Sequence, residues 1–307
     1  MKKIQIFLKA VGILLLITGF ITSCKKDEQP SSAGKTIVDI VNTDANFSLL
    51  KKAVERAGLG SALSTGSLTV FAPDNAAFAA SDIDAADIDA LPVADVANIL
   101  KYHVVGTKVV SGSVPVSDTV NTLLGTNVYA SKNANGVFVN GIKVKSADIL
   151  ATNGVIHVIE KVLLPPAQTI AEIVSDDTEL SLLLVAVVRA GLAGAVSGKA
   201  KFTVFAPTNA AFIAAGFSDA AAINAAPVAA VASIVKAHLF GTNVFASDLI
   251  NGQKVATLES GKSLLVGTTP PSVKIDGSSN PVSNIVLTGV NIIATNGVIH
   301  KIDRVLQ

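Results

Sequence analysis

Histidine is the side chain best suited to acid–base chemistry or metal binding near neutral pH, and this chain of 307 residues contains four. His103 and His238 lie in one repeated motif, LKYHVVGTKVV and VKAHLFGTNVF, and His157 and His300 lie in a second, ATNGVIHVIEKVL and ATNGVIHKIDRVL. A zinc site would need a third and a fourth donor, and the two copies share none. The sequence therefore predicts no metal site.

The alternation of residues around His157 and His300 indicates where these side chains point. In the last predicted strand His157 shares a face with Ile159, whereas the opposite face carries Glu160 in one copy and Asp303 in the other. The face that tolerates charge should lie in water. We expect both histidines to point into the core and to be hydrogen-bonded there, as structural rather than ligating groups.

A run of aspartates, SDIDAADID, could suggest calcium through Asp82, Asp84, Asp87 and Asp89. An EF-hand loop needs glycine at its sixth position and a carboxylate at its twelfth, where this run has Asp87 and Val93. Helix capping and solvation account for these carboxylates better.

Motifs for nucleophilic catalysis are also absent from the sequence. It has no G-x-S-x-G, no H-E-x-x-H and no glycine-rich phosphate loop. We expect no enzymatic activity and no cofactor. One alternative stays open, an envelope hydrolase acting on polymer or ester substrates, because the members of a triad need not be neighbours in sequence. It predicts a pocket that gathers a serine, a histidine and a carboxylate.

The elements that must position these residues form a unit that is written twice. TVFAPDNAAF at Thr69 recurs as TVFAPTNAAF at Thr203, and the other matched segments follow in the same order. Each copy begins with apolar residues at helical spacing, and Pro92 and Pro227 open further helices. Val- and Ile-rich runs punctuated by Asn-Gly pairs then predict antiparallel strands. The fold class is α+β, in two units of about 130 residues each.

The repeated decapeptide is predicted to be a corner of the scaffold rather than a chemical site. Val70 and Phe71 should end a strand that Pro73 stops, and Asp74 or Asn75 should cap a short helix.

Two other segments are predicted to be connectors. Pro165 and Pro166 should link the units stiffly, and Thr268 to Pro281, TTPPSVKIDGSSNP, should form an extended surface loop or hairpin.

The first 23 residues resemble a secretory signal, because lysines precede an apolar run that is too short to span a bilayer. Cys24, the single cysteine, follows Ile-Thr-Ser, as in a bacterial lipobox, and is predicted to be acylated. Residues 24–35 would then be a lipid-anchored flexible tether. Its start, KKDE, is similar to the surface-export signal of Bacteroidetes-type lipoproteins, so we expect a place on the outer membrane, with the periplasmic face as an alternative.

Composition excludes one class of partner. The 24 basic and 23 acidic residues give a net charge of +1, too weak a field to favour nucleic acid. Half of the residues are hydrophobic, which is enough for two buried cores.

With these motifs in view, the chain resembles two tandem fasciclin domains, spanning residues 36–165 and 167–306. The resemblance rests on the T-V-F-A-P-x-N-x-A-F stretch, the Tyr-His pair and the closing N-G-V-I-H-x-I-x-x-V-L stretch. It implies a twisted β-sandwich or wedge flanked by short helices in each domain. It also implies a role in extracellular adhesion or in binding a protein, a matrix or a glycan, with no general cofactor.

In animal members of the family, a Tyr-His element flanked by apolar residues is tied to adhesion, and Tyr102 and His103 match it here. The second copy has Ala237 and His238 instead, which puts a shared role in doubt. The alternative is that both residues pack at a helix-to-strand junction. The sequence therefore predicts a non-catalytic binding lipoprotein of the cell envelope with Tyr102 and His103 as candidate binding residues; a self-associating structural protein is the other alternative.

Overall fold

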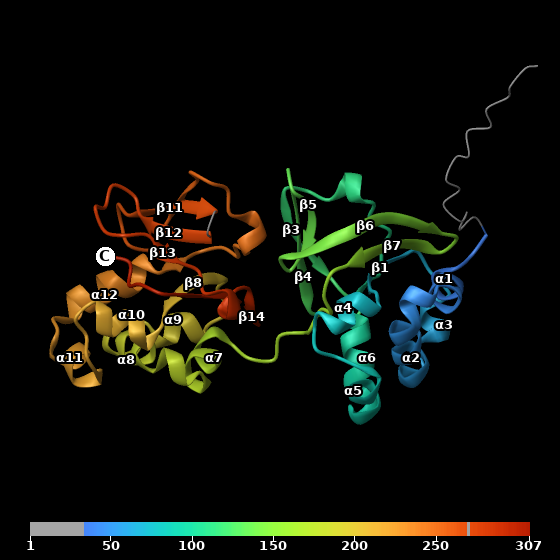
Figure 1. The fold of residues 1–307 in the computed structure, drawn as a ribbon, viewed down its shortest axis with the longest axis horizontal. Coiled ribbons are helices and arrows are strands. Elements are labelled where there is room, and N and C mark those ends of the chain that lie inside the picture. The colour runs from blue at the N-terminus through green and yellow to red at the C-terminus, as the bar shows by residue number, and fades with distance from the viewer. Residues whose placement is uncertain (1–33, 269–270) are drawn as a thin grey trace, which may run out of the picture. The chain divides into compact units, whose positions relative to one another are not determined.

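The computed structural model describes residues 34–268 and 271–307, which form two successive halves of mixed helix and strand (Figure 1). The expected signal segment, Cys24 and most of the tether lie outside the described residues. Within the described part of the chain, no helix is long and apolar enough to cross a membrane. The predicted α+β class with two tandem domains is confirmed.

The first half begins with helices and continues with strands. Its helices are α1 (Ile37–Thr43), α2 (Ser48–Ala57), α3 (Gly60–Leu63), α4 (Asn75–Ala79), α5 (Ala85–Ala90) and α6 (Val93–Tyr102). Its strands are β1 (Leu68–Pro73), β2 (Val104–Val105), β3 (Ser117–Asn121), β4 (Asn127–Asn133), β5 (Gly136–Val139), β6 (Ile142–Ala151) and β7 (Gly154–Ile159). They form one sheet in the order β2-β1-β7-β6-β5-β4-β3.

The second half repeats the plan with two smaller sheets. Its helices are α7 (Ile170–Asp176), α8 (Ser181–Arg189), α9 (Ala193–Ser197), α10 (Asn209–Ala214), α11 (Ala220–Ala225) and α12 (Val228–Ala237). One sheet has the order β14-β15-β8-β9 and comprises β8 (Phe202–Pro207), β9 (Leu239–Phe240), β14 (Ile292–Ala294) and β15 (Gly297–Ile302). The other has the order β10-β11-β12-β13 and comprises β10 (Lys254–Ala256), β11 (Ser263–Thr268), β12 (Pro271–Ile275) and β13 (Ser283–Asn284).

Local signals set the ends of several helices, among them the two starts predicted at Pro92 and Pro227. Thr36 accepts a hydrogen bond from the Asp39 backbone and forms a capping box at the start of α1. Pro92 and Pro227 stand directly before α6 and α12, where a missing N–H costs nothing. Gly58 ends α2 in the left-handed conformation, with φ of 65°.

One pairing of strands differs from the sequence-based expectation of antiparallel strands. β1 and β7 are parallel neighbours, with Val70 opposite Ile156 and Phe71 opposite His157, and β8 and β15 repeat this pairing. A parallel pair needs a long connection, and here most of the domain lies between the two strands. The two repeated motifs are therefore side by side at the centre of each half.

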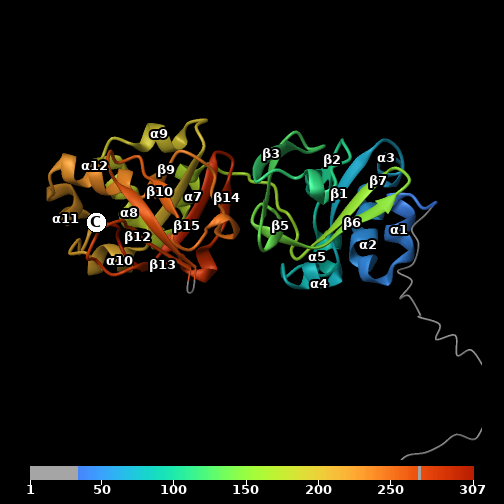
Figure 2. The ribbon, with the colours of Figure 1, turned by 90° about the horizontal axis from the view of Figure 1, so that it is seen from above.

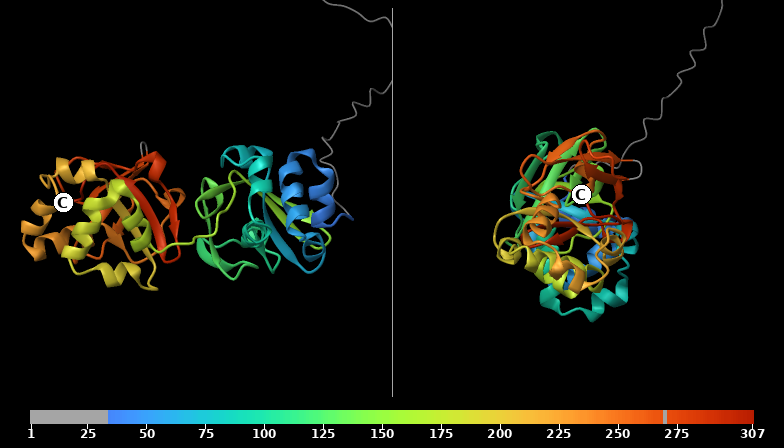
Figure 3. Two further views of the ribbon diagram at one scale, coloured as in Figure 1. Left: turned by 90° about the horizontal axis from the view of Figure 1, so that it is seen from below. Right: turned by 90° about the vertical axis from the view of Figure 1, so that its left-hand side faces the viewer.

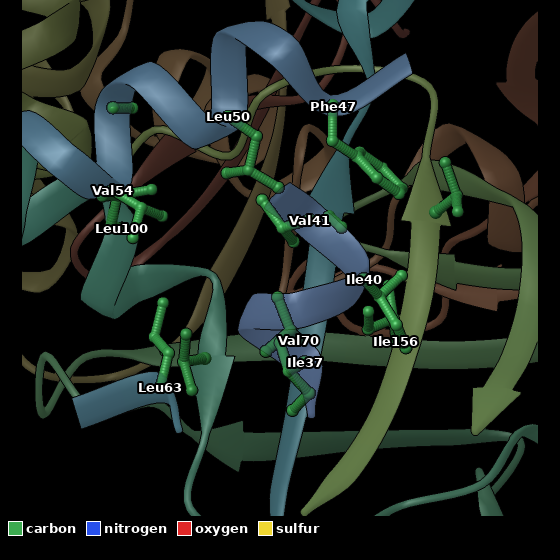
Figure 4. Packing of buried hydrophobic residues seen from close by; sticks show 14 of the residues in the cluster. Ile37, Ile40, Val41, Phe47, Leu50, Val54, Leu63, Val70, Leu100 and Ile156 are labelled. Carbon is green, nitrogen blue, oxygen red and sulfur yellow. The ribbon is translucent and has the colours of Figure 1, made fainter. Parts of the chain in front are cut away.

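The parallel pair of the first half is buried on both faces. The wet face predicted opposite His157, which by alternation includes Val158 as well as Glu160, therefore holds only at the strand end, where Glu160 and its counterpart Asp303 are exposed. On one face, Val70 and Ile156 pack against Ile37, Ile40 and Leu50 of the helices (Figure 4). On the other, Phe71 and Ile159 pack against residues of β4, β5 and β6. Val158, expected on the wet face, is buried. Figure 2 shows α1, α2 and α3 beside β7 and β6.

Of the two alternatives predicted for Thr268 to Pro281, an extended surface loop or a hairpin, the hairpin is confirmed for the first part of the segment. β12 pairs with β11, and Val273 of β12 is buried in the core of the second half. Among the described residues of this segment, the exposed connection comes after the strand, in residues 276–282, where most side chains are exposed. Thr269 and Pro270 lie outside the described residues.

Candidate functional site

The decapeptide beginning at Thr69 forms a strand-to-helix corner, as predicted. Asp74 caps α4 by accepting a hydrogen bond from the Ala77 backbone at 2.9 Å, and its other oxygen pairs with Lys145. Asn75 does not cap this helix. Its side chain accepts from the Leu49 backbone at 3.1 Å and donates to the Ala45 carbonyl at 3.0 Å, so it ties α4 to the start of α2.

The Asn153-Gly154 pair, predicted only as a turn signal, also fastens the first helix to the sheet. Asn153 accepts a hydrogen bond from the Ile37 backbone and donates one to the Leu63 carbonyl, both at 2.8 Å. Gly154 has φ of 155°, and a Cβ there would lie 2.1 Å from the Leu68 carbonyl oxygen. Only glycine fits this close approach of β7 to β1. The motif is therefore a structural joint.

Tyr102 lies at the end of α6 with its side chain in the core on the strand side of the sheet. It is 0% exposed. Its hydroxyl donates to the Asn127 carbonyl at 3.2 Å and accepts from the Asn140 side chain at 2.9 Å. Burial raises the pKa of Tyr102, and the bond from Asn140 opposes that rise. The sequence predicted only a turn at the Asn140-Gly141 pair. It did not predict that the Asn140 side chain bonds to Tyr102.

His103 follows Tyr102, is also buried, and holds a distant backbone segment. Its Nδ1 lies 2.8 Å from the Ile99 carbonyl oxygen, and its Nε2 accepts from the Leu163 backbone at 2.9 Å. Because a backbone N–H can only donate, Nε2 must be unprotonated and Nδ1 must carry the proton. Burial lowers the pKa of His103 to about 4, opposed in part by the bond to Ile99.

His238 repeats this arrangement in the second half. It bonds to the Ile234 carbonyl at 2.8 Å and accepts from the Leu306 backbone at 2.9 Å, and burial lowers its pKa to about 4. The imidazole is therefore a shared structural feature of both halves. The tyrosine is not, because Ala237 replaces it.

Burial bears directly on the candidate binding residues. Tyr102 and His103 are 0% and 2% exposed and offer no surface for direct contact with a partner in this structure. The geometry matches the alternative that both residues pack at a helix-to-strand junction. A role for them in recognition stays a prediction, and it would be indirect, through Leu163 and the connection that follows it.

His157 and His300 are buried, as predicted. The Nε2 atom of His157 lies 2.8 Å from the Val109 carbonyl oxygen, and its Nδ1 accepts from the Asp148 backbone at 3.2 Å. His300 makes the same two bonds, to the Val244 carbonyl and from the Asn291 backbone. Burial lowers the pKa of His300 to about 4. Both nitrogens of each histidine are thus engaged by the backbone, which leaves no lone pair for a metal or a substrate.

A serine, an aspartate and a histidine do meet in the first half, which is the grouping that the hydrolase alternative predicts. Ser111 Oγ donates to Asp148 Oδ2 at 2.5 Å, and His157 contacts the backbone of Asp148 rather than its carboxylate. In a catalytic triad the serine bonds to the histidine, and the carboxylate bonds to the other histidine nitrogen. Here the order is different, and His157 Nε2 is held by Val109.

The grouping is instead a backbone joint. Asp148 has φ of 61° and lies at a register shift of β6, where its carboxylate accepts bonds from the Ser111 backbone and hydroxyl. Burial raises the pKa of the Asp148 carboxyl, but the bonds from Ser111 outweigh it and leave the pKa below its ordinary value. In the second half Asn291, with φ of 56°, accepts from the Ala246 backbone in the same way. The matching roles of Asp148 and Asn291 were not predicted from the sequence. The signal for them is an Asp or Asn within or next to a strand, because these residues adopt positive φ more readily than most.

The aspartate run caps a helix, as predicted. Asp84 and Asp87 form a capping box at the start of α5, and Asp89 pairs with Lys52 at 2.6 Å. Across the described ranges, no three acidic, histidine or cysteine side chains are grouped so that they could hold a metal ion.

The voids beside the histidines are too small for a ligand. Apolar voids of about 20 Å³ and about 40 Å³ adjoin His103, and one of about 40 Å³ adjoins His238. A water molecule needs about 10 to 15 Å³, so each void has room for one to three waters at most.

Comparison with known proteins identifies the family of these two halves. The fasciclin domain model matches residues 45–165 and again residues 178–307. Protein sll1483 of Synechocystis is 40% identical over 141 residues, which are 44% of this chain and 77% of that protein.

Two animal proteins are similar over both halves. The transforming growth factor-beta-induced protein ig-h3 of Sus scrofa is 30% identical over 244 residues, 78% of this chain and 35% of that protein. Periostin of Homo sapiens is 29% identical over 247 residues, 78% of this chain and 28% of that protein. The chain thus spans about a third of the length of these relatives. A solved FAS1 domain pair from the insect cell adhesion molecule Fasciclin I matches 84% of this chain with a TM-score of 0.42 and 20% identity.

Proposed function

The chain belongs to the fasciclin domain family, and from this premise we propose that it is a non-catalytic binding protein that acts in adhesion at the cell envelope. The observation that supports binding rather than catalysis is the state of the four histidines. Each has both ring nitrogens hydrogen-bonded to the backbone, so none can accept a proton from a substrate without losing a hydrogen bond that holds its domain together.

The proposed partner is an extracellular protein, matrix component or glycan. Rigid strands hold the ends of exposed connections, and such connections carry recognition in many scaffolds. Residues 276–282, which follow the buried strand β12, are the connection that we propose for contact with the partner. For Tyr102 and His103 we propose a supporting role, because they hold the backbone rather than the surface.

The proposed location is a lipid-anchored one. Cys24 would be acylated after removal of residues 1–23, which changes the net charge from +1 to −2 because Lys2, Lys3 and Lys9 leave with the signal. Each buried CH₂ of an acyl chain adds about 0.8 kcal/mol of membrane affinity, so several chains would hold the domains on the outer membrane. Residues 25–35 would let them stand off by ~20 Å.

An adhesion assay tests the binding function. Beads coated with residues 24–307, with Cys24→Ser to prevent acylation, are presented to cells, matrix proteins and a glycan panel. We expect adherence to at least one of them, and weaker adherence when residues 276–282 are replaced by a Gly-Ser segment of equal length. Beads that adhere to none of these surfaces would refute the proposal.

A separate experiment tests the anchor. Intact cells that produce the wild type or Cys24→Ala are fractionated and treated with an external protease. We expect the wild type in the outer membrane and degraded by the protease, and the variant released from the membrane fraction. Equal partition of the two proteins would rule out acylation at Cys24.

A further inference from the structure

The two halves contain one helix with the same role and very different surfaces. α2 reads SLLKKAVERA from Ser48, and the matching stretch of the second half, α8 with its last residue Ala190, reads SLLLVAVVRA from Ser181. The two helices have the same residue types at their buried positions, and packing against the core explains this agreement. The exposed positions do not agree, and the first half serves as an internal reference for what a solvated surface at this place looks like.

In the first half these positions carry two ion pairs. Lys51 lies 3.9 Å from Glu55, and Lys52 lies 2.6 Å from Asp89 of α5. In the second half the first pair is replaced by Leu184 and Val188. Exposed ion pairs contribute little to stability, typically about 0 to 1 kcal/mol, so their loss does not reflect a need of the fold.

The second pair has also lost its charge, because Val185 and Asn224 replace Lys52 and Asp89. The helices that pack against α8 show the same change, with Ala222 of α11 and Ala230 of α12 in place of Asp87 and Asp95. The loss of charge therefore extends over three neighbouring helices.

We call the surface made by Leu184, Val185, Val188, Ala222 and Asn224 the α8 face. Val188 is 61% exposed, and Leu184 and Val185 are half-buried. Val228, at the start of α12, and Ile213, on α10, are also exposed. Figures 1 and 3 show that the helices of the second half gather on one side of its strands.

We propose that two copies of this chain associate through the α8 face. Charged groups of a partner would lose their hydration on binding here and would find no opposite charge on this face, so binding of a charged surface is unfavourable. A two-fold axis brings each residue close to its own copy, which is favourable only where the patch has no charge to repel itself. The α8 face meets that condition, whereas the five matching positions of the first half carry two lysines, a glutamate and two aspartates. The inference does not rest on the proposed function.

The size of the face predicts a weak association. A helix of nine residues is about 13 Å long, and packed neighbours lie about 8 to 10 Å away. The face therefore covers only a few hundred Å², below the roughly 800 Å² per partner of a standard stable interface. We expect a dissociation constant between about 10 μM and 1 mM, which leaves the protein monomeric in dilute solution.

The test is sedimentation equilibrium of residues 24–307 with Cys24→Ser, a substitution that excludes acyl micelles and disulfide-linked dimers. The protein concentration runs from about 5 μM to 1 mM, which covers the expected range of dissociation constants. The α8 variant combines Leu184→Lys, Val185→Lys, Val188→Glu and Asn224→Asp, so that the second half carries the residues of the first. Val188→Glu alone changes one exposed side chain. We expect dimers in the wild type, and dissociation constants at least about tenfold higher in both variants, or about 1.4 kcal/mol. Circular dichroism checks their fold.

A matched control is Val116→Lys, which places a charge on an apolar side chain of the first half that is 82% exposed. It should leave the association unchanged. The proposal is overturned if the wild type stays monomeric at about 1 mM, if either α8 variant associates like the wild type, or if Val116→Lys weakens association equally. A monomeric wild type whose bead adherence is lost in the α8 variant would mean that a different protein covers this face.

Discussion

Acid should destabilise both domains well above the pH at which carboxyl groups titrate, because of the buried histidines. His103, His238 and His300 have pKa values lowered by burial from 6.5 to about 4. In the unfolded chain the pKa values of the same imidazoles return to about 6.5. Between these values the unfolded state binds more protons than the folded state, so stability falls as pH falls from 6.5 toward 4.

The magnitude follows from linkage. The difference between 6.5 and about 4 corresponds to about 3 kcal/mol for each histidine once the pH is below both values. About 2 kcal/mol of this is lost between pH 7 and pH 5, so the first domain loses about 2 kcal/mol through His103, and the second loses about 4 kcal/mol through His238 and His300. The total stability of one domain is about 5 to 15 kcal/mol, which makes the loss a large effect in the second domain. Carboxyls with lowered pKa values, such as Asp148, add a loss of the same sign at lower pH.

The assay is urea unfolding followed by far-ultraviolet circular dichroism at pH 7, 6 and 5. His238→Gln provides the internal test, because it removes one titrating group while leaving His103 and His300 in place. It should lower stability at pH 7, and it should reduce the loss between pH 7 and pH 5 by about 2 kcal/mol. An NMR titration of the folded protein should show no midpoint near 6.5 for these three imidazoles.

Two results would refute this reasoning. One is a free energy of unfolding at pH 5 within about 1 kcal/mol of its value at pH 7. The other is a His238→Gln variant with the pH dependence of the wild type, which would mean that burial does not hold this imidazole neutral.

Three substitutions test the joints of the scaffold by chemical denaturation at pH 7. Gly154→Ala should lower the free energy of unfolding by more than about 3 kcal/mol, since its Cβ would lie 2.1 Å from the Leu68 carbonyl oxygen. Gly60→Ala, the control, has open space around it and should be neutral or stabilising. Equal effects of the two substitutions would contradict the close contact between the strands. Tyr102→Phe should cost about 1 to 3 kcal/mol by leaving the Asn140 amide unpaired, and no loss would argue against that bond. Asn296→Ala should cost a similar amount, because the Asn296 side chain bonds three backbone groups; an unchanged midpoint would exclude this role.

Features that depend on neighbours in sequence could be predicted. The cap at Asp74, the helix starts after Pro92 and Pro227, and the capping role of Asp84 follow from local preferences for backbone conformation. The inward direction of His157 also followed from the alternation of the strand. The wet face expected opposite it was correct for Glu160 and Asp303, which are exposed, but wrong for Val158, which is buried, because alternation does not tell how many layers pack against a strand.

The joints between distant segments could not be predicted. Asp148 and Ser111 are 37 residues apart, and Asn140 and Tyr102 are 38 apart, so no local preference connects them. For Tyr102 the sequence left surface contact and packing at a helix-to-strand junction open. The structure shows it buried, and the choice could not be made from local sequence because the strands that cover it come later in the chain.

The amino-acid pattern alone was sufficient for the two repeated units, their α+β class and the scaffold role of the decapeptide, because repeats, periodicity and caps are written in contiguous residues. The parallel pairing of β1 with β7, the full burial of Tyr102 and the order of Ser111, Asp148 and His157 emerged only from tertiary packing. Those features depend on which segments meet after the chain has closed loops of many residues, and that choice is made by the free energy of the whole domain.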